Sequence, residues 1–153
     1  MANTYTQIFI QSVCVVQNRS SLIHPMWKTE LYKYMTGIVQ QNGHKLIAIN
    51  GVSDHVHLFI GMKPHQSLSD LMQDVKGDSS GWINQKGFIK GNFSWQAGYG
   101  GFSYSISQID AVVRYIHNQE QHHKRKTFIE EYLEILKKFK TPFDERYIFK
   151  PIA

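Results

Sequence analysis

The chain has one cysteine, Cys14, among its 153 residues. A single cysteine excludes an internal disulfide and a zinc site built from cysteines, and it suits a reducing compartment. Apolar runs such as residues 8–16 are too short to cross a bilayer, and residues 1–7 lack the basic and apolar regions of a signal peptide. We therefore expect a cytoplasmic protein without a membrane segment, in which any metal ion is bound by His, Asp, Glu or Gln.

Positive charge is only mildly in excess of negative charge. Lysine and arginine number 17 against 12 aspartates and glutamates, which gives a net charge of +5. This sign weakly favours a polyanionic partner such as nucleic acid. A hydrophobic content of 42% with 13% aromatic residues is typical of a globular protein, and neither repeats nor low-complexity linkers interrupt it. Length and composition together predict one domain spanning residues 1–153.

The spacing of apolar residues predicts the order of the secondary-structure elements. Runs rich in β-branched and aromatic residues predict strands at 6–18, 44–52, 55–62 and 92–107. Apolar residues three or four positions apart predict helices at 24–43, 63–87, 108–123 and 127–139. Gly77 suggests that the second helix is weak or bent, and Gly98, Gly100 and Gly101 suggest a flexible connector before the third.

This order of elements, strand, helix, strand, strand, helix, strand, is that of the ferredoxin-like or split βαβ fold. We therefore expect an α+β protein with a ferredoxin-like (RRM-like) βαββαβ antiparallel sheet, helices on one face and additional C-terminal helices. The strands at 44–52 and 55–62 are expected to form a hairpin that turns near residues 52–54. Residues 107–153 are expected to form a C-terminal helical segment that carries Tyr115, with 141–153 as a short tail.

His55 and His57 are the first candidate functional residues, because two polar rings stand in an otherwise apolar strand. Side chains alternate along a strand, so both rings share one face and could bind one metal ion. Phe59 and Ile60 stand where the HxHxDH motif of metallohydrolases requires Asp and His. A hydrogen-bonded pair of core histidines is the alternative interpretation. Asp54 could orient a ligand histidine, but a role in the turn of the hairpin is favoured.

Tyr115 and Gln119 are a second candidate pair. On the predicted helix 108–123, Tyr115 lies outside the apolar arc, and Gln119 follows it by one helical turn. Residues at i and i+4 present their polar atoms to the same neighbour, here a hydroxyl and an amide oxygen. A phenol beside a metal ion is suited to covalent catalysis, whereas the alternative is an ordinary surface aromatic.

Together these motifs resemble a known family. The sequence Asp54-His55-Val56-His57, followed by Tyr115 within VVRYIHNQ, resembles the single-tyrosine transposases of the HUH class, the small transposase A proteins of bacterial insertion sequences. The segments LSDLMQDVKGDSS, FSWQAGYGGFSYS and HHKRKTFIEEYLEILKKF are similar to the same family. The likeness therefore covers roughly residues 5–150.

The resemblance implies a DNA transposase that cleaves and rejoins single-stranded DNA at insertion-sequence ends. By this resemblance, His55, His57 and Gln119 bind a divalent metal ion, Mg²⁺ or Mn²⁺, that polarises the scissile phosphate. Tyr115 attacks this phosphate and leaves a 5′-phosphotyrosine covalent intermediate and a free 3′-hydroxyl. The implied partners are DNA hairpins near the element ends and a second copy of the chain, with the tyrosine helix of one subunit completing the other's active site in trans.

Basic residues around the tyrosine helix are candidates for DNA contacts. Arg114, Lys124, Arg125 and Lys126 flank that helix, and Lys76 is a further candidate. A solvated linker that only aids solubility is the alternative. Two other functions also fit the sequence: a non-catalytic nucleic-acid-binding module derived from such a transposase, and a metal-dependent nuclease that uses bound water. Neither function needs a tyrosine nucleophile.

Overall fold

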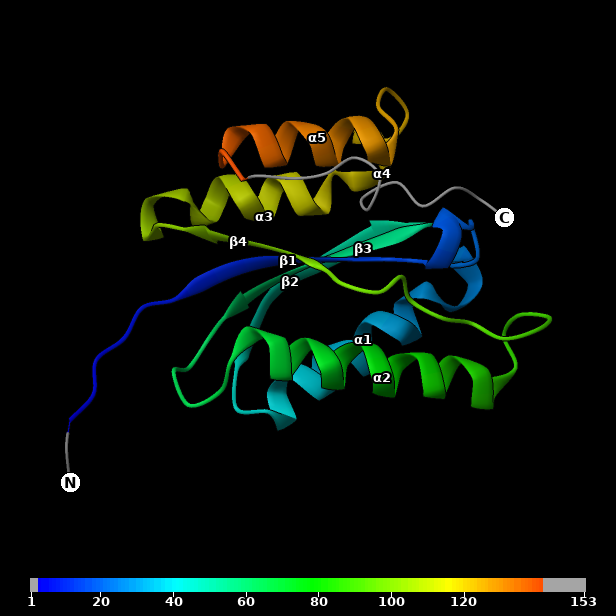
Figure 1. Cartoon of the computed structure of the whole chain (residues 1–153), viewed down its shortest axis with the longest axis horizontal. Helices are drawn as coiled ribbons and strands as arrows, with labels where there is room; N and C mark the ends of the chain where they lie inside the picture. The colour runs from blue at the N-terminus through cyan, green and yellow to red at the C-terminus, as the bar shows by residue number, and fades with distance from the viewer. Residues whose placement is uncertain (1–2, 142–153) are drawn as a thin grey trace.

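Four antiparallel strands form the centre of the molecule, in the spatial order β2-β3-β1-β4 (Figure 1). The computed structural model describes residues 3–141, so the predicted tail lies outside the described residues from 142 onward. The strands are β1 (Phe9–Val15), β2 (Lys45–Val52), β3 (His55–Gly61) and β4 (Gly100–Tyr104). The helices are α1 (Pro25–Gln41), α2 (Leu68–Lys86), α3 (Ile109–His117), α4 (Gln119–His122) and α5 (Phe128–Lys138), with 3-10 turns η1 (Gln17–Arg19) and η2 (Ile106–Gln108).

The order of elements confirms the predicted ferredoxin-like arrangement. β1 and β3 lie side by side in the centre of the sheet, each antiparallel to its neighbours. β2 and β3 form the predicted hairpin, whose turn at Ser53 and Asp54 leaves Val52 opposite His55. No helix among residues 3–141 combines the length and apolar character needed to cross a membrane.

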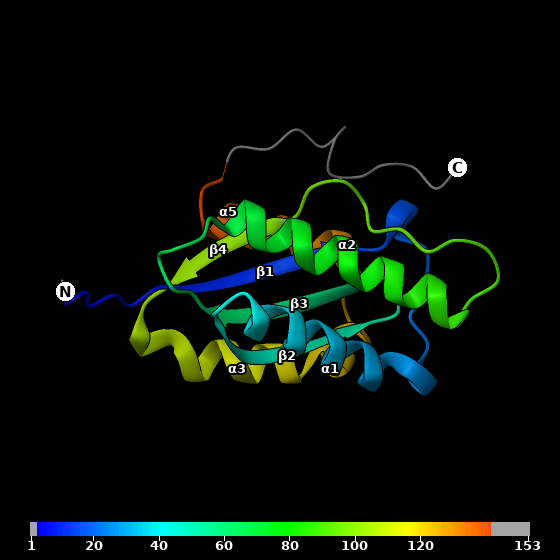
Figure 2. The same cartoon turned by 90° about the horizontal axis from the view of Figure 1, so that it is seen from below.

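The two faces of the sheet are covered by different helices, as Figure 1 and Figure 2 show. α1 and α2 pack on one face, where Val56, Leu58 and Ile60 of β3 join the main hydrophobic core. The additional helices α3, α4 and α5 lie on the opposite face. Because side chains alternate along β3, His55 and His57 point toward these additional helices. The helices beyond the βαββαβ unit therefore enclose the two histidines.

The last strand is shorter than predicted. β4 begins at Gly100, and residues 92–99 lie outside it. The side chain of Lys76 in α2 donates to the carbonyl oxygens of Gln96 and Gly98, at 2.8 and 2.6 Å. This segment is therefore held by α2. The prediction of a flexible glycine connector is wrong for the last two of its three glycines, which lie inside β4.

The helix predicted at 108–123 is divided into α3 and α4, which separate at Asn118. Asn50 of β2 donates hydrogen bonds to the carbonyl oxygens of Ile116 and His117, at 3.0 and 3.1 Å. These are carbonyls that the next turn of an uninterrupted helix would use as acceptors. The contact with β2 therefore accompanies the end of α3 and anchors that end to the sheet.

Substitution of Gly51 by alanine is expected to destabilise the β2–β3 hairpin strongly. A Cβ atom at this position would lie 2.1 Å from the carbonyl oxygen of His55 and 2.8 Å from Cα of Val56. We expect Gly51→Ala to lower the free energy of unfolding by about 3 kcal/mol, the upper end of typical overpacking costs. Urea unfolding measures this change, and a variant as stable as the wild type would contradict the close approach.

Gly77→Ala is the matched control for this experiment. α2 continues through Gly77 despite the predicted weak point, and nothing lies within 4 Å of an added Cβ atom. Because alanine loses less backbone entropy than glycine in a helix, the variant should gain about 0.5–1 kcal/mol of unfolding free energy. The two glycine substitutions are therefore expected to change stability in opposite directions.

Candidate active site

His55 and His57 lie near each other on β3, and both are fully buried. Glu131 of α5 reaches them, with its Oε1 atom 3.0 Å from His57 Nε2 and 3.4 Å from His55 Nε2. The ligand atoms of these three residues lie within 4.8 Å of one another. Two imidazoles from β3 and a carboxylate from α5 therefore converge on one point.

The outer nitrogens of both histidines are held by oxygen acceptors. His55 Nδ1 lies 2.7 Å from Asp54 Oδ1, and His57 Nδ1 lies 2.8 Å from Gln11 Oε1. Each Nδ1 therefore carries a hydrogen, which leaves the Nε2 lone pair of a neutral ring directed at Glu131. Asp54 thus orients His55 from within the hairpin turn, whereas the sequence alone favours only the turn role.

Gln119 adds a further oxygen to this point. Its Oε1 lies 3.3 Å from His55 Nε2, and the side chain is fully buried at the start of α4. Nitrogen lone pairs and the oxygens of Gln119 and Glu131 then face one another, which is unfavourable unless protons or a cation stand between them. Burial lowers the pKa of His57 and so disfavours its protonation. Imidazole, amide and carboxylate donors suit a divalent metal ion, so the residues present fit one.

Four histidines surround Glu131, which is 1% exposed. Besides the β3 pair, His122 Nε2 and His123 Nε2 lie 3.3 and 3.2 Å from its carboxylate oxygens. Burial alone would raise the pKa of this carboxyl, but contacts with His123, His55 and His57 hold it well below its usual range. Burial likewise opposes protonation of His55, yet the carboxylates beside it raise its pKa to about 9. The buried carboxylate thus favours a positive charge beside it, which either a proton or a divalent cation would supply.

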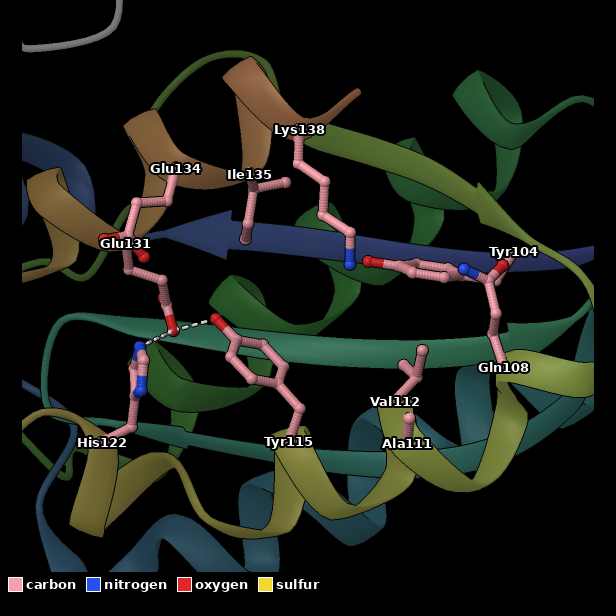
Figure 3. Close-up of a pocket in the computed structure, with 10 residues that line it drawn as sticks. All are labelled: Tyr104, Gln108, Ala111, Val112, Tyr115, His122, Glu131, Glu134, Ile135 and Lys138. Atoms are coloured by element: carbon pink, nitrogen blue, oxygen red, sulfur yellow. Dashed lines mark hydrogen bonds and ion pairs between the residues drawn. The ribbon is translucent and has the colours of Figure 1, made fainter. Parts of the chain in front are cut away.

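Tyr115 of α3 completes the site. Its hydroxyl donates a hydrogen bond to Glu131 Oε2 (Figure 3). Its ring lies edge-on to His57, with centroids 5.8 Å apart. Burial raises the pKa of the Tyr115 phenol, and the charge of Glu131 raises it further. Gln119 Nε2 also donates to Glu131 Oε2, at 3.2 Å. The structure therefore brings together Tyr115, Gln119, His55 and His57 within one chain, through a carboxylate that they share.

The predicted DNA-contacting residues are divided between the helices of the site and α2 on the opposite face of the sheet. Arg114, Lys124 and Arg125 are exposed. Lys126 pairs with an exposed glutamate of α5, with nitrogen to oxygen distances of 2.6 and 2.7 Å. Lys76 lies on α2 and donates to backbone carbonyls of the segment before β4. Contact of these five residues with DNA stays a prediction.

Comparison with known proteins identifies the family. Residues 4–119, which are more than half of the chain, match the family described as IS200-like transposases. The chain belongs to the IS200-like transposase family. This membership confirms the resemblance carried by the histidine and tyrosine motifs. No curated protein shows a significant match to this transposase.

Two solved structures share the fold of this transposase. A proposed transposase from Deinococcus radiodurans is 22% identical, with a TM-score of 0.63 over 78% of this chain and 95% of that one. A REP-associated tyrosine transposase bound to a REP hairpin is 14% identical, with a TM-score of 0.61 over 80% of this chain and 73% of that one. At these identities the likeness establishes the fold.

Glu131 is the site residue that sequence reasoning misses in this IS200-like transposase. The family match ends at Gln119, before α5 begins. A signal for Glu131 is nevertheless present, because Phe128 and Ile135 occupy the buried face of α5 and Glu131 stands between them at helical spacing. A carboxylate on the apolar face of an amphipathic helix needs a buried polar partner. The partners here are the histidines.

Proposed function

We propose that this IS200-like transposase cleaves and rejoins single-stranded DNA with Tyr115 as its nucleophile. Membership of a transposase family supports action on DNA ends. The observation that carries the proposal is the hydrogen bond from the Tyr115 hydroxyl to Glu131, whose other oxygen faces His55 and His57. A nucleophile and a metal-binding group of side chains thus share one carboxylate.

The proposed reaction exchanges one phosphodiester for another. The Tyr115 oxygen attacks the scissile phosphorus, the P–O3′ bond breaks, and a 5′-phosphotyrosine and a free 3′-hydroxyl result. The phenolic proton is released to water and the leaving 3′ oxygen takes a proton from water, so the step gains or loses no net proton. Because the phosphotyrosine is itself a phosphodiester, a DNA 3′-hydroxyl can later attack it and rejoin the strand without ATP.

His55, His57 and Gln119 are the proposed ligands of a divalent metal ion, Mg²⁺ or Mn²⁺, with Glu131 as a further oxygen donor. When bound, this ion supplies charge stabilisation to the phosphate oxygens during attack. The acceptors on the outer histidine nitrogens keep both rings in the tautomer that offers Nε2. Tyr115 is held beside these ligands by its hydrogen bond.

Single-stranded DNA hairpins at element ends are the proposed substrate, because one solved structure of similar fold is a tyrosine transposase bound to a REP hairpin. Arg114 within α3, the three basic residues 124–126 after α4, and Lys76 on α2 are proposed to contact phosphates. In the proposed homodimer, exchange of α3 would rebuild the contact between Tyr115 and Glu131 in trans. The protein would act in the cytoplasm and associate with the nucleoid when bound to DNA.

Incubation with labelled hairpin DNA and Mn²⁺ tests the proposed function. A 3′-end label should move with the protein on a denaturing gel, and a 5′-end label should appear in a shorter DNA fragment. Cleavage without a protein-linked band would instead indicate a nuclease that uses water. Binding without cleavage would indicate a non-catalytic nucleic-acid-binding module.

A further inference from the structure

A cavity of about 260 Å³ lies between α3 and α5, with β4 beside it (Figure 3). Ala111 and Val112 of α3 and Ile135 of α5 give it aliphatic walls. Tyr104 of β4 lies toward one end, and Tyr115 lies toward the other (Figure 3). Aliphatic side chains and two aromatic rings thus make up half of its lining, and the other half is polar: Gln108, His122, Glu131, Glu134 and Lys138.

This cavity gives access to the proposed nucleophile. Tyr115 and Glu131 line it, whereas His55 and His57 are fully buried and do not. A phosphate that meets the Tyr115 hydroxyl can approach through this space. The nucleotide attached to that phosphate then needs a place beside the tyrosine ring, and the cavity provides one.

The direction of the proposed reaction decides which nucleotide this is. Attack on phosphorus is roughly in line, so the leaving 3′ oxygen departs on the side opposite the Tyr115 oxygen. The nucleotide on the 5′ side of the cleaved bond therefore lies away from the tyrosine. The nucleotide on the 3′ side stays joined to Tyr115 through its 5′-phosphate, and it remains next to the cavity.

We propose that the cavity binds the base of the nucleotide immediately 3′ of the cleaved bond, an inference that rests on the proposed function. The rings of Tyr104 and Tyr115 and the aliphatic walls suit an unpaired base, since every base has an apolar π-face. Pockets for drug-sized ligands have volumes of about 300–1,000 Å³. A cavity of about 260 Å³ is smaller, and therefore suits a single base rather than a base pair.

The charges around the cavity are compatible with a nucleotide. Lys138 lines it, with its ammonium 5.9 Å from the centroid of the Tyr104 ring, and offers a cation to a neighbouring phosphate. Glu134, which also lines the cavity, is paired with Lys126 at 2.6 Å. Glu131 is surrounded by histidines. Both lining carboxylates thus have basic partners that reduce their repulsion of a phosphate.

Tyr104 also connects the cavity to the candidate metal ligands. Gln11 Nε2 donates to the Tyr104 hydroxyl at 2.8 Å, and Gln11 Oε1 lies 2.8 Å from His57 Nδ1. A base that packs against Tyr104 therefore contacts a ring whose position is set by the same glutamine that orients His57. Binding of the base would thereby position the 5′-phosphate of the same nucleotide beside the histidines.

Abasic hairpins test the proposal. The cleaved bond is first mapped from the length of the fragment that the wild type releases. One hairpin then carries an abasic site immediately 3′ of that bond, and a second carries it immediately 5′. Fluorescence anisotropy measures the affinity of the Tyr115→Phe protein, which retains the ring. We expect the 3′ abasic site to weaken binding by about 5- to 150-fold, the range for loss of a stacked base, and the 5′ site to weaken it much less.

Two substitutions link this effect to the cavity. Ala111→Trp fills the space, so in this background the penalty of the 3′ abasic site should disappear. Lys138→Ala should weaken binding more than Lys137→Ala, since Lys137 is its exposed neighbour on α5 and does not line the cavity. Thermal unfolding checks that Ala111→Trp is folded, and the lysine pair provides the test if it is not.

The outcomes separate this proposal from the proposed function. If the two abasic sites weaken DNA binding equally, the base-binding role is overturned. The same holds if the 3′ abasic site still weakens binding when the cavity is filled. Neither result affects the proposed function, since the wild type still forms the covalent adduct. Equal affinities of Lys138→Ala and Lys137→Ala would also count against it. Failure of the wild type to form an adduct with any hairpin would overturn the proposed function, and the cavity proposal with it.

Discussion

The Tyr115→Phe variant is expected to lose the covalent DNA adduct, with a fall in the cleavage rate of at least about 10³-fold. Phenylalanine keeps the ring that lies against His57 but lacks the oxygen that forms the phosphotyrosine bond. Binding of hairpin DNA should persist, because the basic residues around the site are unchanged. The measurement is the time course of the protein-linked band on a denaturing gel, alongside the affinity for uncleaved DNA.

Loss of this hydroxyl should leave the protein folded, since Glu131 keeps its hydrogen bond from Gln119 at 3.2 Å. Tyr132→Phe is the matched control. Tyr132 is also partly buried, but its ring stacks on Phe128 in another part of the same layer. Adduct formation should survive in this control. A Tyr115→Phe protein that still forms the adduct would show that another residue is the nucleophile.

The Glu131→Gln variant is expected to bind Mn²⁺ at least 10-fold more weakly than the wild type, since loss of even an outer-shell partner costs about 10–100-fold. The amide keeps the shape of the side chain but lacks the negative charge that would compensate the cation. Isothermal titration calorimetry measures this affinity without DNA and without catalysis. The same variant should also lose metal-dependent cleavage, because Tyr115 loses its carboxylate acceptor.

Glu134→Gln is the matched control for the metal titration. Glu134 lies further along α5, where it is exposed and paired with Lys126. Surface ion pairs contribute little, so this variant should bind Mn²⁺ like the wild type. If Glu131→Gln binds Mn²⁺ with the affinity of the wild type, the histidines and Gln119 suffice as ligands.

Stability has to be followed in the same experiment. Loss of one partner from a buried charged group can cost about 3–5 kcal/mol, so Glu131→Gln is the variant at risk of unfolding. Circular dichroism and thermal unfolding detect this. If the glutamine variant does not fold, Glu131→Asp takes its place, because it keeps the charge but withdraws it from the histidines by one methylene. A weaker Mn²⁺ affinity is then the expected result.

The order of the strands and helices follows from the sequence alone. So do two pairs of residues in the candidate site, His55 with His57 and Tyr115 with Gln119. The period of two along a strand is enough to place His55 and His57 on one face of β3. Helical spacing is enough to bring Tyr115 and Gln119 toward the same neighbour, even though α3 and α4 separate between them. The order of strands and helices predicts the sheet, because short connections restrict the possible topologies.

Packing between distant elements decides the rest. Periodicity shows which face of α5 is apolar, but it cannot show that this face covers the histidines of β3 and brings Glu131 to them. The same holds for Asn50, which binds the end of α3, and for the cavity between α3 and α5. The physical reason is that local patterns depend on neighbours in the chain. The carboxylate that joins the nucleophile to the histidines depends on which faces meet when the sheet and its helices pack.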